Sequence, residues 1–520
     1  MVTVDGTQRP SRIRLALADA APIVLVGLGM VAFAILVRGG AIASWTYINP
    51  DEVELMAQAR AARLSPVPFT TWTMGTTGPM WPLTLALLGA LGLPLTVAAA
   101  HLLSAILTGL IGVGVFALAR RSYSTGWAVV LTFAWWAPLA LVVPLLGLLT
   151  DYSALSTEYL PCALLVVVAL LGFRATGGRP GWLVAGGVVG MFAVGGKFQV
   201  APLAFVLLLL IVIRTRKGIA ARLRGVGWVA IGALVPVLAL ALVLLVAPGV
   251  SDALIAQQFG FLGSYADGTD LASRIGNTVN ALGAARWYLL AALVALIWLA
   301  MRSDLSTAIA RAALALAGVA AVFAGGRGFG HYLIILIVAI GIAAALPLRK
   351  GLSPIPGRWA LPITATATAL AVAALATVGF AIGRLSPATP ADVVAALSPD
   401  SVVRNEALAR ACPPGSTAVV WGWAPEIYLA QDWVNAIPYF NILGLTIDGP
   451  VRDGAEPIIL SALDHADCVV EALGPPYFAV GPESSLVAVY PSSAEVLADS
   501  FSLRPGVLAD CGGCSVYVRR

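Results

Sequence analysis

The first 385 residues consist mainly of long apolar runs separated by short polar segments. A helix that spans a bilayer needs about 20 predominantly apolar residues. The first run extends from about Leu15 to Val37 and follows Arg9, Arg12 and Arg14. Because this run is longer than the apolar core of a cleaved signal peptide, we predict a retained first helix whose N-terminus lies in the cytoplasm.

Further runs have the length or near-length of membrane helices. They are residues 95–118, 126–147, 159–173, 182–196, 198–213, 226–248, 284–301, 307–324, 331–347 and 358–383. Together with the first run, they predict about eleven transmembrane helices. The run at 80–94 is shorter and bounded by prolines, and we assign it to the membrane interface.

Basic residues fix the orientation of these helices. If the N-terminus is cytoplasmic, every strong basic cluster falls in a cytoplasmic loop, as the positive-inside rule requires. These clusters are Arg120–Arg121, Arg174–Arg179, Arg214–Arg224, Arg302 and Arg349–Lys350. An odd number of helices then places residues 385–520 outside the cytoplasm. We expect a multi-pass protein of a bacterial plasma membrane.

Composition supports a membrane protein. The 520-residue chain is 59% hydrophobic and only 11% charged, with a mean hydropathy of +0.92. Soluble proteins carry about 25% charged residues, so most of this surface must face lipid. The formal net charge of +5 does not indicate nucleic-acid binding, because the basic residues lie in short clusters between apolar runs.

The C-terminal part of the chain is richer in Pro, Asp, Glu and Ser. It contains short β-rich runs and helical stretches, a mixture that is typical of an α/β domain. The β-rich runs are Thr417–Trp423, Cys468–Ala472, Leu486–Tyr490 and Ser515–Val518, and the helical stretches include Asp392–Ala409 and Ile458–His465. We therefore expect an all-α polytopic membrane domain over residues 1–384 and a small extracytoplasmic α/β domain over residues 385–520.

Four of the five cysteines, Cys412, Cys468, Cys511 and Cys514, lie in the C-terminal part, and Cys162 lies in an apolar run. Cysteines in an extracytoplasmic domain usually form disulfides. Four cysteines allow three pairings, between which the sequence does not choose. The alternative is a zinc site that includes the Cys511-x-x-Cys514 pair.

The first outward loop contains the sequence Asn49-Pro50-Asp51-Glu52. This pattern predicts a helix start, with Asn49 as the N-cap, Pro50 as the first helical residue and Glu52 closing a capping box. The same segment can present a catalytic carboxylate, because a helix start holds the side chain of Asp51 in a defined position. Both interpretations can hold together.

Other outward loops carry further polar candidates. Asp151 and Glu158 follow one apolar run, where they either let the chain leave the membrane or provide a second carboxylate that faces the first. Lys197 lies in GGKFQVAP, at the interface or against a phosphate, because a charge deep in the bilayer is costly. Arg327 and His331 lie in AGGRGFGHYL, where glycines admit a ligand and arginine can donate two bonds to a phosphate. The alternative for His331 is a residue at a helix start.

His101 lies within an apolar run, and we interpret it as an interior polar residue with satisfied hydrogen bonds. The chain contains no Walker loop, HExxH or GxSxG motif. Energy or a sugar must therefore arrive in another form, such as an activated lipid. A second class of function, a secondary transporter or flippase of envelope precursors, would require paired helix interruptions at mid-membrane. A third is a non-catalytic scaffold for envelope assembly.

In the order of its motifs, the chain resembles the GT-C superfamily of membrane glycosyltransferases. The protein O-mannosyltransferases and lipid A aminoarabinose transferases are the most similar members. The motifs are NPDEVELMAQARA, TTGPMWPLTLALL, ALARR, GKFQVAP, GRGFGHYL and, at residues 419–433, VVWGWAPEIYLAQDW. The resemblance extends from the first helix to about residue 350.

The resemblance implies roles for three groups of residues. The catalytic pair of the family corresponds to Asp51 and Glu52. Its second-loop carboxylate, close to the acceptor, corresponds to Asp151 or Glu158. Its donor-phosphate residues correspond to Lys197, Arg327 and His331.

The implied reaction transfers a hexosyl or pentosyl group from a polyprenyl phosphate to a hydroxyl of a glycan, lipid or protein. Asp51 would be the base, and direct attack with one base implies inversion at the anomeric carbon. The sequence identifies no certain cofactor. Two facing carboxylates can hold a divalent metal, although the sequence shows no full ligand set.

Overall fold

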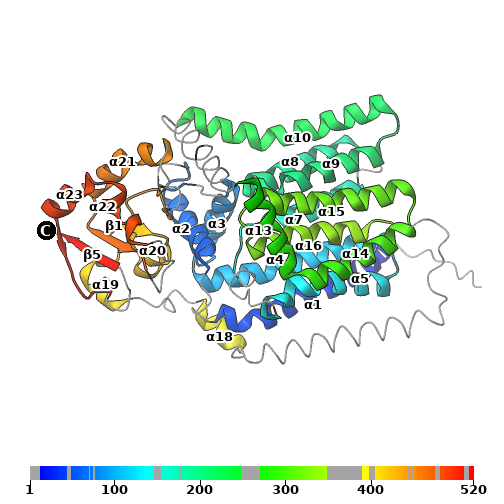
Figure 1. Cartoon of the computed structure of the whole chain (residues 1–520). Helices are drawn as coiled ribbons and strands as arrows, with labels where there is room; N and C mark the ends of the chain where they lie inside the picture. Colours follow the sequence, from blue (N-terminus) through cyan, green and yellow to red (C-terminus); the bar gives the residue numbers. More distant parts are fainter. Residues whose placement is uncertain are drawn as a thin grey trace, which may run out of the picture.

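The computed structural model of the chain describes most of the apolar runs and most of the C-terminal part. The described residues are 12–43, 49–68, 71–73, 77–145, 154–174, 179–247, 260, 270–347, 389–397, 405–442, 445–446, 450–474, 481–508 and 514–520. A helical bundle forms one end of the molecule, and a small sheet with short helices forms the other (Figure 1).

With one exception, α13 (Leu271–Ala284), the bundle helices coincide with predicted apolar runs; α13 was not predicted. They are α1 (Arg12–Ile42), α4 (Val97–Ala119), α5 (Thr125–Leu145), α7 (Tyr159–Arg174), α8 (Pro180–Gly196), α9 (Ala201–Thr215), α10 (Ile219–Val246), α13 (Leu271–Ala284), α14 (Arg286–Met301), α15 (Leu305–Gly325) and α16 (Leu333–Ala345). The run at 358–383 and the cluster Arg349–Lys350 lie outside the described residues.

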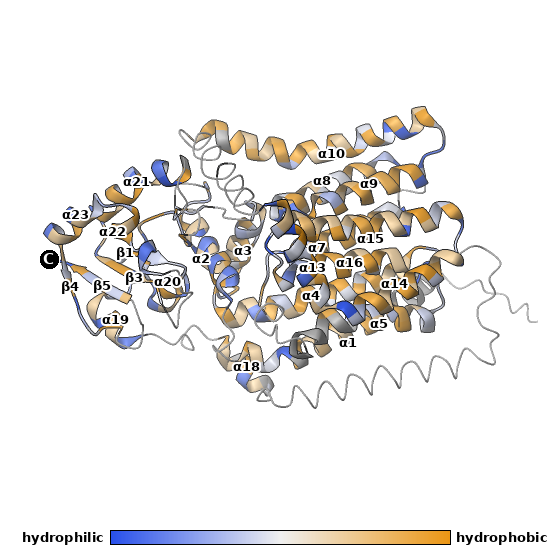
Figure 2. Ribbon diagram, viewed as in Figure 1, coloured by the Kyte–Doolittle hydropathy of each residue, from blue (hydrophilic) through white to orange (hydrophobic). Residues whose placement is uncertain are grey.

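Most of the bundle is hydrophobic, as the orange colour in Figure 2 shows. Among the described residues, four helices are long and apolar enough to cross a membrane, and a fifth span results if α13 and α14, bent by 83°, count as one. Other apolar helices are shorter, including α7, α8 and the helix that ends at Ala345. The chain is a multi-pass membrane protein, and its total of about eleven helices stays a prediction.

Two short helices, α2 (Pro50–Leu64) and α3 (Met80–Ala90), lie between the bundle and the sheet (Figure 1). The start of α2 confirms the predicted capping box. Asn49 Oδ1 accepts a hydrogen bond from the backbone N–H of Asp51 at 2.9 Å, and Pro50 is the first helical residue. Glu52 Oε1 accepts a longer bond from the N–H of Asn49 at 3.4 Å. The helix start is thus fixed from both sides.

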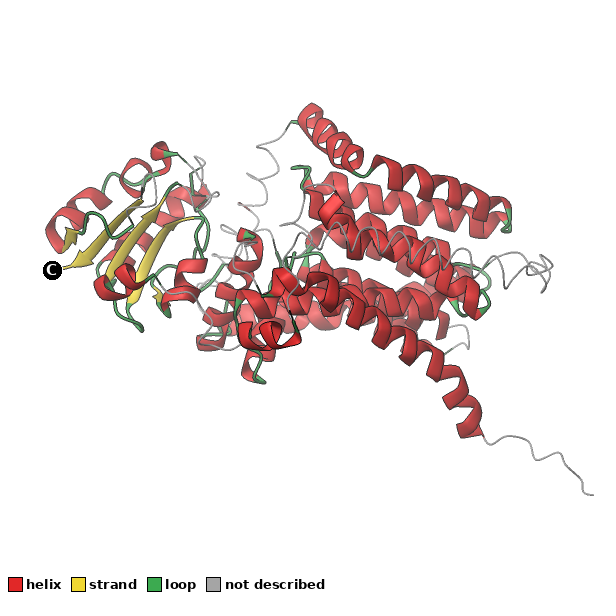
Figure 3. Cartoon of the chain, turned by 90° about the horizontal axis from the view of Figure 1, so that it is seen from below, coloured by secondary structure: helices red, strands yellow, loops and turns green. Residues whose placement is uncertain are grey.

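We refer to the described residues between 405 and 520 as the C-terminal α/β region (Figure 3). Its five-stranded sheet has the order β2-β1-β3-β5-β4, in which β1 is parallel to β2 and β3, and β5 is antiparallel to β3 and β4. The strands are β1 (Thr417–Gly422), β2 (Val434–Asn435), β3 (Cys468–Ala472), β4 (Phe501–Leu503) and β5 (Cys514–Arg519). The helices are α19 (Glu406–Ala411), α20 (Glu426–Gln431), α21 (Pro450–Leu463), α22 (Leu486–Val489) and α23 (Ser493–Ser500), and α18 (Pro390–Ala396) precedes the region.

One predicted strand is wrong. The run Leu486–Tyr490 begins with the helix α22, because Ser485 caps it by accepting a bond from the N–H of Ala488 at 3.2 Å. Leu486 and Val489, three residues apart, are buried, while the two residues between them are exposed. That spacing belongs to a helix, although the run is rich in residues that favour strands. The strands β2 and β4 are too short to be recognised in the sequence.

A disulfide joins Cys412, directly after α19, to Cys468 at the start of β3. This selects one of the three pairings that the sequence allows. Cys514 is disulfide-bonded as well, and Cys511 lies outside the described residues. Cys162 is a free, buried thiol in α7.

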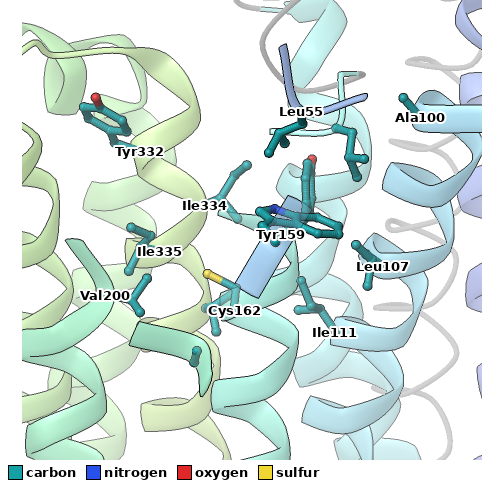
Figure 4. Close-up of a cluster of buried hydrophobic side chains, with 14 of the residues drawn as sticks. Leu55, Ala100, Leu107, Ile111, Tyr159, Cys162, Val200, Tyr332, Ile334 and Ile335 are labelled. Carbon is teal, nitrogen blue, oxygen red and sulfur yellow. The ribbon is translucent and has the colours of Figure 1, made fainter. Parts of the chain in front are cut away.

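The interior beneath α2 is filled by apolar side chains from several segments. Figure 4 shows Leu55 of α2, Leu107 and Ile111 of α4, Cys162 of α7 and Ile335 of α16 in one cluster. All five side chains are buried. Because lipid is as apolar as these side chains, close packing is the main source of the stability of such a core.

Two polar side chains are buried in this interior and bond to each other. Glu52 of α2 and His101 of α4 are fully buried, and Oε1 of Glu52 lies 2.7 Å from Nε2 of His101. Nδ1 of His101 donates to the carbonyl of Ala41 at 2.7 Å, and Oε2 of Glu52 accepts from the N–H of Leu155 at 2.8 Å. The pair therefore ties α2, α4, the end of α1 and the segment before α7 together, and His101 is satisfied as predicted.

A second buried group, Arg38 of α1, binds the same segments. Its guanidinium donates to Ser104 Oγ at 2.5 Å and to the hydroxyl of Tyr159 at 2.9 Å, and Ser104 in turn donates to the carbonyl of Ala154 at 2.9 Å. A buried charge requires such partners to offset its desolvation. The sequence analysis did not single out this arginine.

Replacing His101 by Leu should destabilise the protein strongly, because Glu52 then stays buried without its partner. The loss of one member of a buried pair typically costs about 3–5 kcal/mol. Thermal unfolding in detergent measures this effect. The matched control is His465→Leu, at an exposed position of the C-terminal α/β region, which should change stability by less than about 0.5 kcal/mol. Equal effects of the two substitutions would show that the Glu52–His101 pair does not hold the fold together.

Candidate active site

Four segments of the chain meet at the end of the bundle that faces α2 and the C-terminal α/β region. They are the start of α2, the segment before α7, the junction between α8 and the 3₁₀ helix η3 (Phe198–Val200), and the connection from α15 to the 3₁₀ helix η5 (Gly330–Tyr332). Each contributes one polar side chain: Asp51, Glu158, Lys197 and His331. The sequence analysis had named all four as candidates.

Asp51 is the second helical residue of α2, and its side chain is 26% exposed. Its Oδ2 atom lies 3.8 Å from Nε2 of His331, whose side chain is only 4% exposed. The N-terminus of a helix carries a partial positive charge that favours an ionised carboxylate. Asp51 is thus an accessible carboxylate beside the buried imidazole of His331.

Lys197 and Glu158 form a buried ion pair. The Lys197 Nζ to Glu158 Oε1 distance is 3.3 Å, and the two side chains are 4% and 0% exposed. Burial would raise the pKa of Glu158, but Lys197, His331 and the hydroxyl of Thr157 together lower it below its ordinary value. Lys197 also lies over the ring of Tyr332, 5.8 Å from its centre. Glu158 therefore stays ionised and holds the ammonium group in place.

The position of Lys197 depends on a close backbone contact. Lys197 ends α8, and its N–H donates to the carbonyl of Ala193 at 3.1 Å. Gly78, in the TTGP motif, donates to the carbonyl of Gly196 at 3.2 Å. A Cβ atom at residue 78 would lie 2.0 Å from the carbonyl oxygen of Gly195. Only glycine fits at residue 78. This glycine lets the TTGP motif pack against the GGK motif, although the two lie far apart in the sequence.

The connection that carries Arg327 and His331 is also shaped by glycine. Gly326 and Gly328 have φ values of 70° and 69°, a conformation that other residues rarely adopt. Asn277 of α13 donates from Nδ2 to the carbonyl of Gly326 at 2.9 Å. Phe329 stacks on His331 with ring centres 5.4 Å apart. Arg327 is partly exposed in this connection, on the same side of the bundle as His331.

Glu52 and Asp151 are the remaining carboxylate candidates. Glu52 faces the interior, with both carboxylate oxygens bonded and no exposed surface. Asp151 lies outside the described residues, so its competition with Glu158 for the second-loop carboxylate is open. Among the described residues, no group of three or more His, Cys, Asp or Glu side chains is arranged to hold a metal ion.

Glu54 is a site residue that the sequence analysis missed. It lies one turn after Asp51 on α2 and is 8% exposed. Burial and the nearby charge of Asp51 raise its pKa to about 7, against the opposing effects of Asn441, Trp423 and Lys197. Its three-residue spacing from Asp51 on a helix was the available signal, because residues i and i+3 share one face.

Comparison with known proteins supports the fold. No model of a protein family and no curated protein matches the sequence. The crystal structure of ArnT from Cupriavidus metallidurans bound to undecaprenyl phosphate is similar, with a TM-score of 0.55 at 15% identity over 96% of this chain and 98% of that chain. Its apo state gives the same TM-score and identity over 97% and 98% of the two chains.

The oligosaccharyltransferase of Archaeoglobus fulgidus, tethered with an acceptor peptide, gives a TM-score of 0.46 at 12% identity over 97% of this chain and 74% of that chain. ArnT belongs to the GT-C superfamily of membrane glycosyltransferases. The overlap with ArnT covers the helical bundle as well as the C-terminal α/β region. The chain therefore has the GT-C fold that its motifs indicated.

Proposed function

We propose that this chain is a glycosyltransferase that moves a sugar from a polyprenyl phosphate to an acceptor hydroxyl. The observation that carries the proposal is the meeting of an accessible carboxylate, Asp51, with the buried side chains of Lys197 and His331 at one end of a GT-C fold. A base and an anion-binding group at one place are what such a transfer needs. The positive-inside pattern supports a site outside the cytoplasm.

In the proposed reaction, Asp51 takes the proton of the acceptor hydroxyl as its oxygen forms a bond to the anomeric carbon. The bond from that carbon to the phosphate oxygen breaks, and its electron pair leaves with the polyprenyl phosphate. Lys197, Arg327 and His331 stabilise the additional negative charge on the phosphate. Attack from the face opposite to the phosphate inverts the anomeric carbon. The sugar class, hexose or pentose, stays open.

The carboxylates have separate tasks in this proposal. Glu158 orients the ammonium group of Lys197, since the two form a buried pair. Glu52 holds the start of α2 against His101, so it positions Asp51 without touching the substrate. Asp151 remains the alternative carboxylate on the acceptor side.

Replacing Asp51 by Asn should abolish most sugar transfer while leaving the fold intact. The backbone N–H of residue 51 still bonds to Asn49, but an amide cannot accept the proton, and general-base catalysis contributes about 10²–10⁴-fold. The assay measures release of undecaprenyl phosphate in liposomes from undecaprenyl-phosphate mannose, arabinose and aminoarabinose, offered in parallel with candidate acceptors.

Asp453→Asn is the matched control, because Asp453 is an exposed aspartate in the first turn of α21. It should leave turnover unchanged. Near-normal turnover of the Asp51→Asn protein would refute the role of Asp51 as base.

Replacing Arg327 by Lys should weaken binding of undecaprenyl phosphate. Lysine keeps the positive charge but loses the two parallel bonds that a guanidinium donates to a phosphate. A bond to a charged group contributes about 1.5–3 kcal/mol, so we expect a loss of about tenfold or more in affinity. Calorimetric titration in nanodiscs measures it.

Arg302→Lys, after α14 in a predicted cytoplasmic loop, is the control and should bind as the wild type does. An unchanged affinity of Arg327→Ala would show that Arg327 does not contact the phosphate.

A further inference from the structure

The contact between α2 and the C-terminal α/β region is made partly by the side chain of Glu54. Oε2 of Glu54 accepts a hydrogen bond from Nδ2 of Asn441 at 2.7 Å, across 387 residues of sequence. Oε1 accepts a bond from Nε2 of Gln58, one turn further along α2, at 2.9 Å. The carboxyl group of Glu54 therefore lies at the boundary between α2 and the C-terminal α/β region, which are neighbours in Figure 1.

A second contact across the same boundary does not involve the site. Arg60 of α2 forms an ion pair with Asp432, directly after α20, and donates to the carbonyl of Tyr428 at 3.4 Å. Asp432 is the one residue other than glycine with a positive φ, 60°, in the described part of the chain. This contact fixes α20 on α2 independently of Glu54.

The charges that act on Glu54 belong to the candidate active site. Asp51, one turn earlier on the same helix, repels its ionised form, and Lys197 attracts it. Asn441 and Trp423, both in the C-terminal α/β region, also favour the ionised form. Glu54 is thus influenced by the base from one side and by the C-terminal α/β region from the other.

We propose that Glu54 is a positioning residue through which the docked C-terminal α/β region sets the strength of Asp51 as a base. Donors from that region favour ionised Glu54, and a second negative charge nearby makes Asp51 hold a proton more strongly. A stronger base takes the proton of the acceptor hydroxyl more readily. The inference rests on the proposed function, because it assigns the base to Asp51.

The pKa of about 7 for Glu54 supports this proposal, because it places the change of charge near neutral pH. Above that pH, Glu54 is ionised and Asp51 is the stronger base. Below it, Glu54 is protonated, the repulsion is removed and Asp51 becomes the weaker base. The two carboxyl groups titrate as a coupled pair. Turnover should therefore fall several-fold as the pH decreases through about 7.

Two measurements on the full-length protein in nanodiscs test the proposal. Infrared difference spectroscopy follows the band of the protonated carboxyl group during a pH titration, and needs no substrate. Initial rates with undecaprenyl-phosphate mannose, arabinose and aminoarabinose follow the pH dependence of turnover. Burial also raises the pKa of Glu426 to about 7, so the band near pH 7 has two contributions. Glu54→Gln should lose the part that belongs to Glu54, and its rate should stay several-fold lower and flat across that region.

Asn441→Leu removes a donor that favours the charged form, so both transitions should move to higher pH by up to about one unit. Trp423→Phe should move them in the same direction and serves as a second variant if Asn441→Leu misfolds. Arg60→Gln is the matched control. It weakens the other contact with the C-terminal α/β region and should leave both transitions at their wild-type pH.

A band near pH 7 that keeps its full wild-type amplitude in Glu54→Gln, or a pH profile that Glu54→Gln leaves unchanged, overturns the proposal. An equal shift in Arg60→Gln and Asn441→Leu overturns the specific link through Glu54. These results are distinct from a failure of the proposed function. That failure would appear as near-normal turnover of Asp51→Asn, and the infrared titration of Glu54 does not depend on it.

Discussion

The buried pair of Glu52 and His101 is the interaction on which the arrangement of the site depends. Two polar groups in an apolar interior are stable only when all their bonds are made. Here the partners come from α2, α4, the end of α1 and the segment before α7. Because Asp51 precedes Glu52 directly, fixing Glu52 inside the protein turns Asp51 outward.

The buried Glu52–His101 pair also helps to position the second half of the site, the ion pair of Glu158 and Lys197. The segment that donates from Leu155 to Glu52 continues to Glu158, which binds Lys197. Lys197 in turn lies at the end of α8. There Gly78 allows the loop before α3 to contact the backbone of the last residues of α8. A chain of contacts therefore runs from a structural carboxylate to the cation that we assign to the donor phosphate.

Much of this organisation could be predicted from the sequence. Apolar length located the bundle helices, and the capping pattern located the start of α2, since both signals are local. The sequence could not show that Glu52 points inward and Asp51 outward, because that difference depends on packing against His101. Nor could it identify Arg38 or Glu54, whose partners lie far away in the chain.

The central claim is that one site holds both the base and the donor phosphate. A cryo-electron microscopy map of the protein with undecaprenyl phosphate tests it most directly. The account predicts phosphate density within hydrogen-bond distance of Lys197 and Arg327, on the side that Asp51 faces. Phosphate density at the opposite end of the bundle, near Arg214 and Arg302, with none beside Lys197, would contradict it.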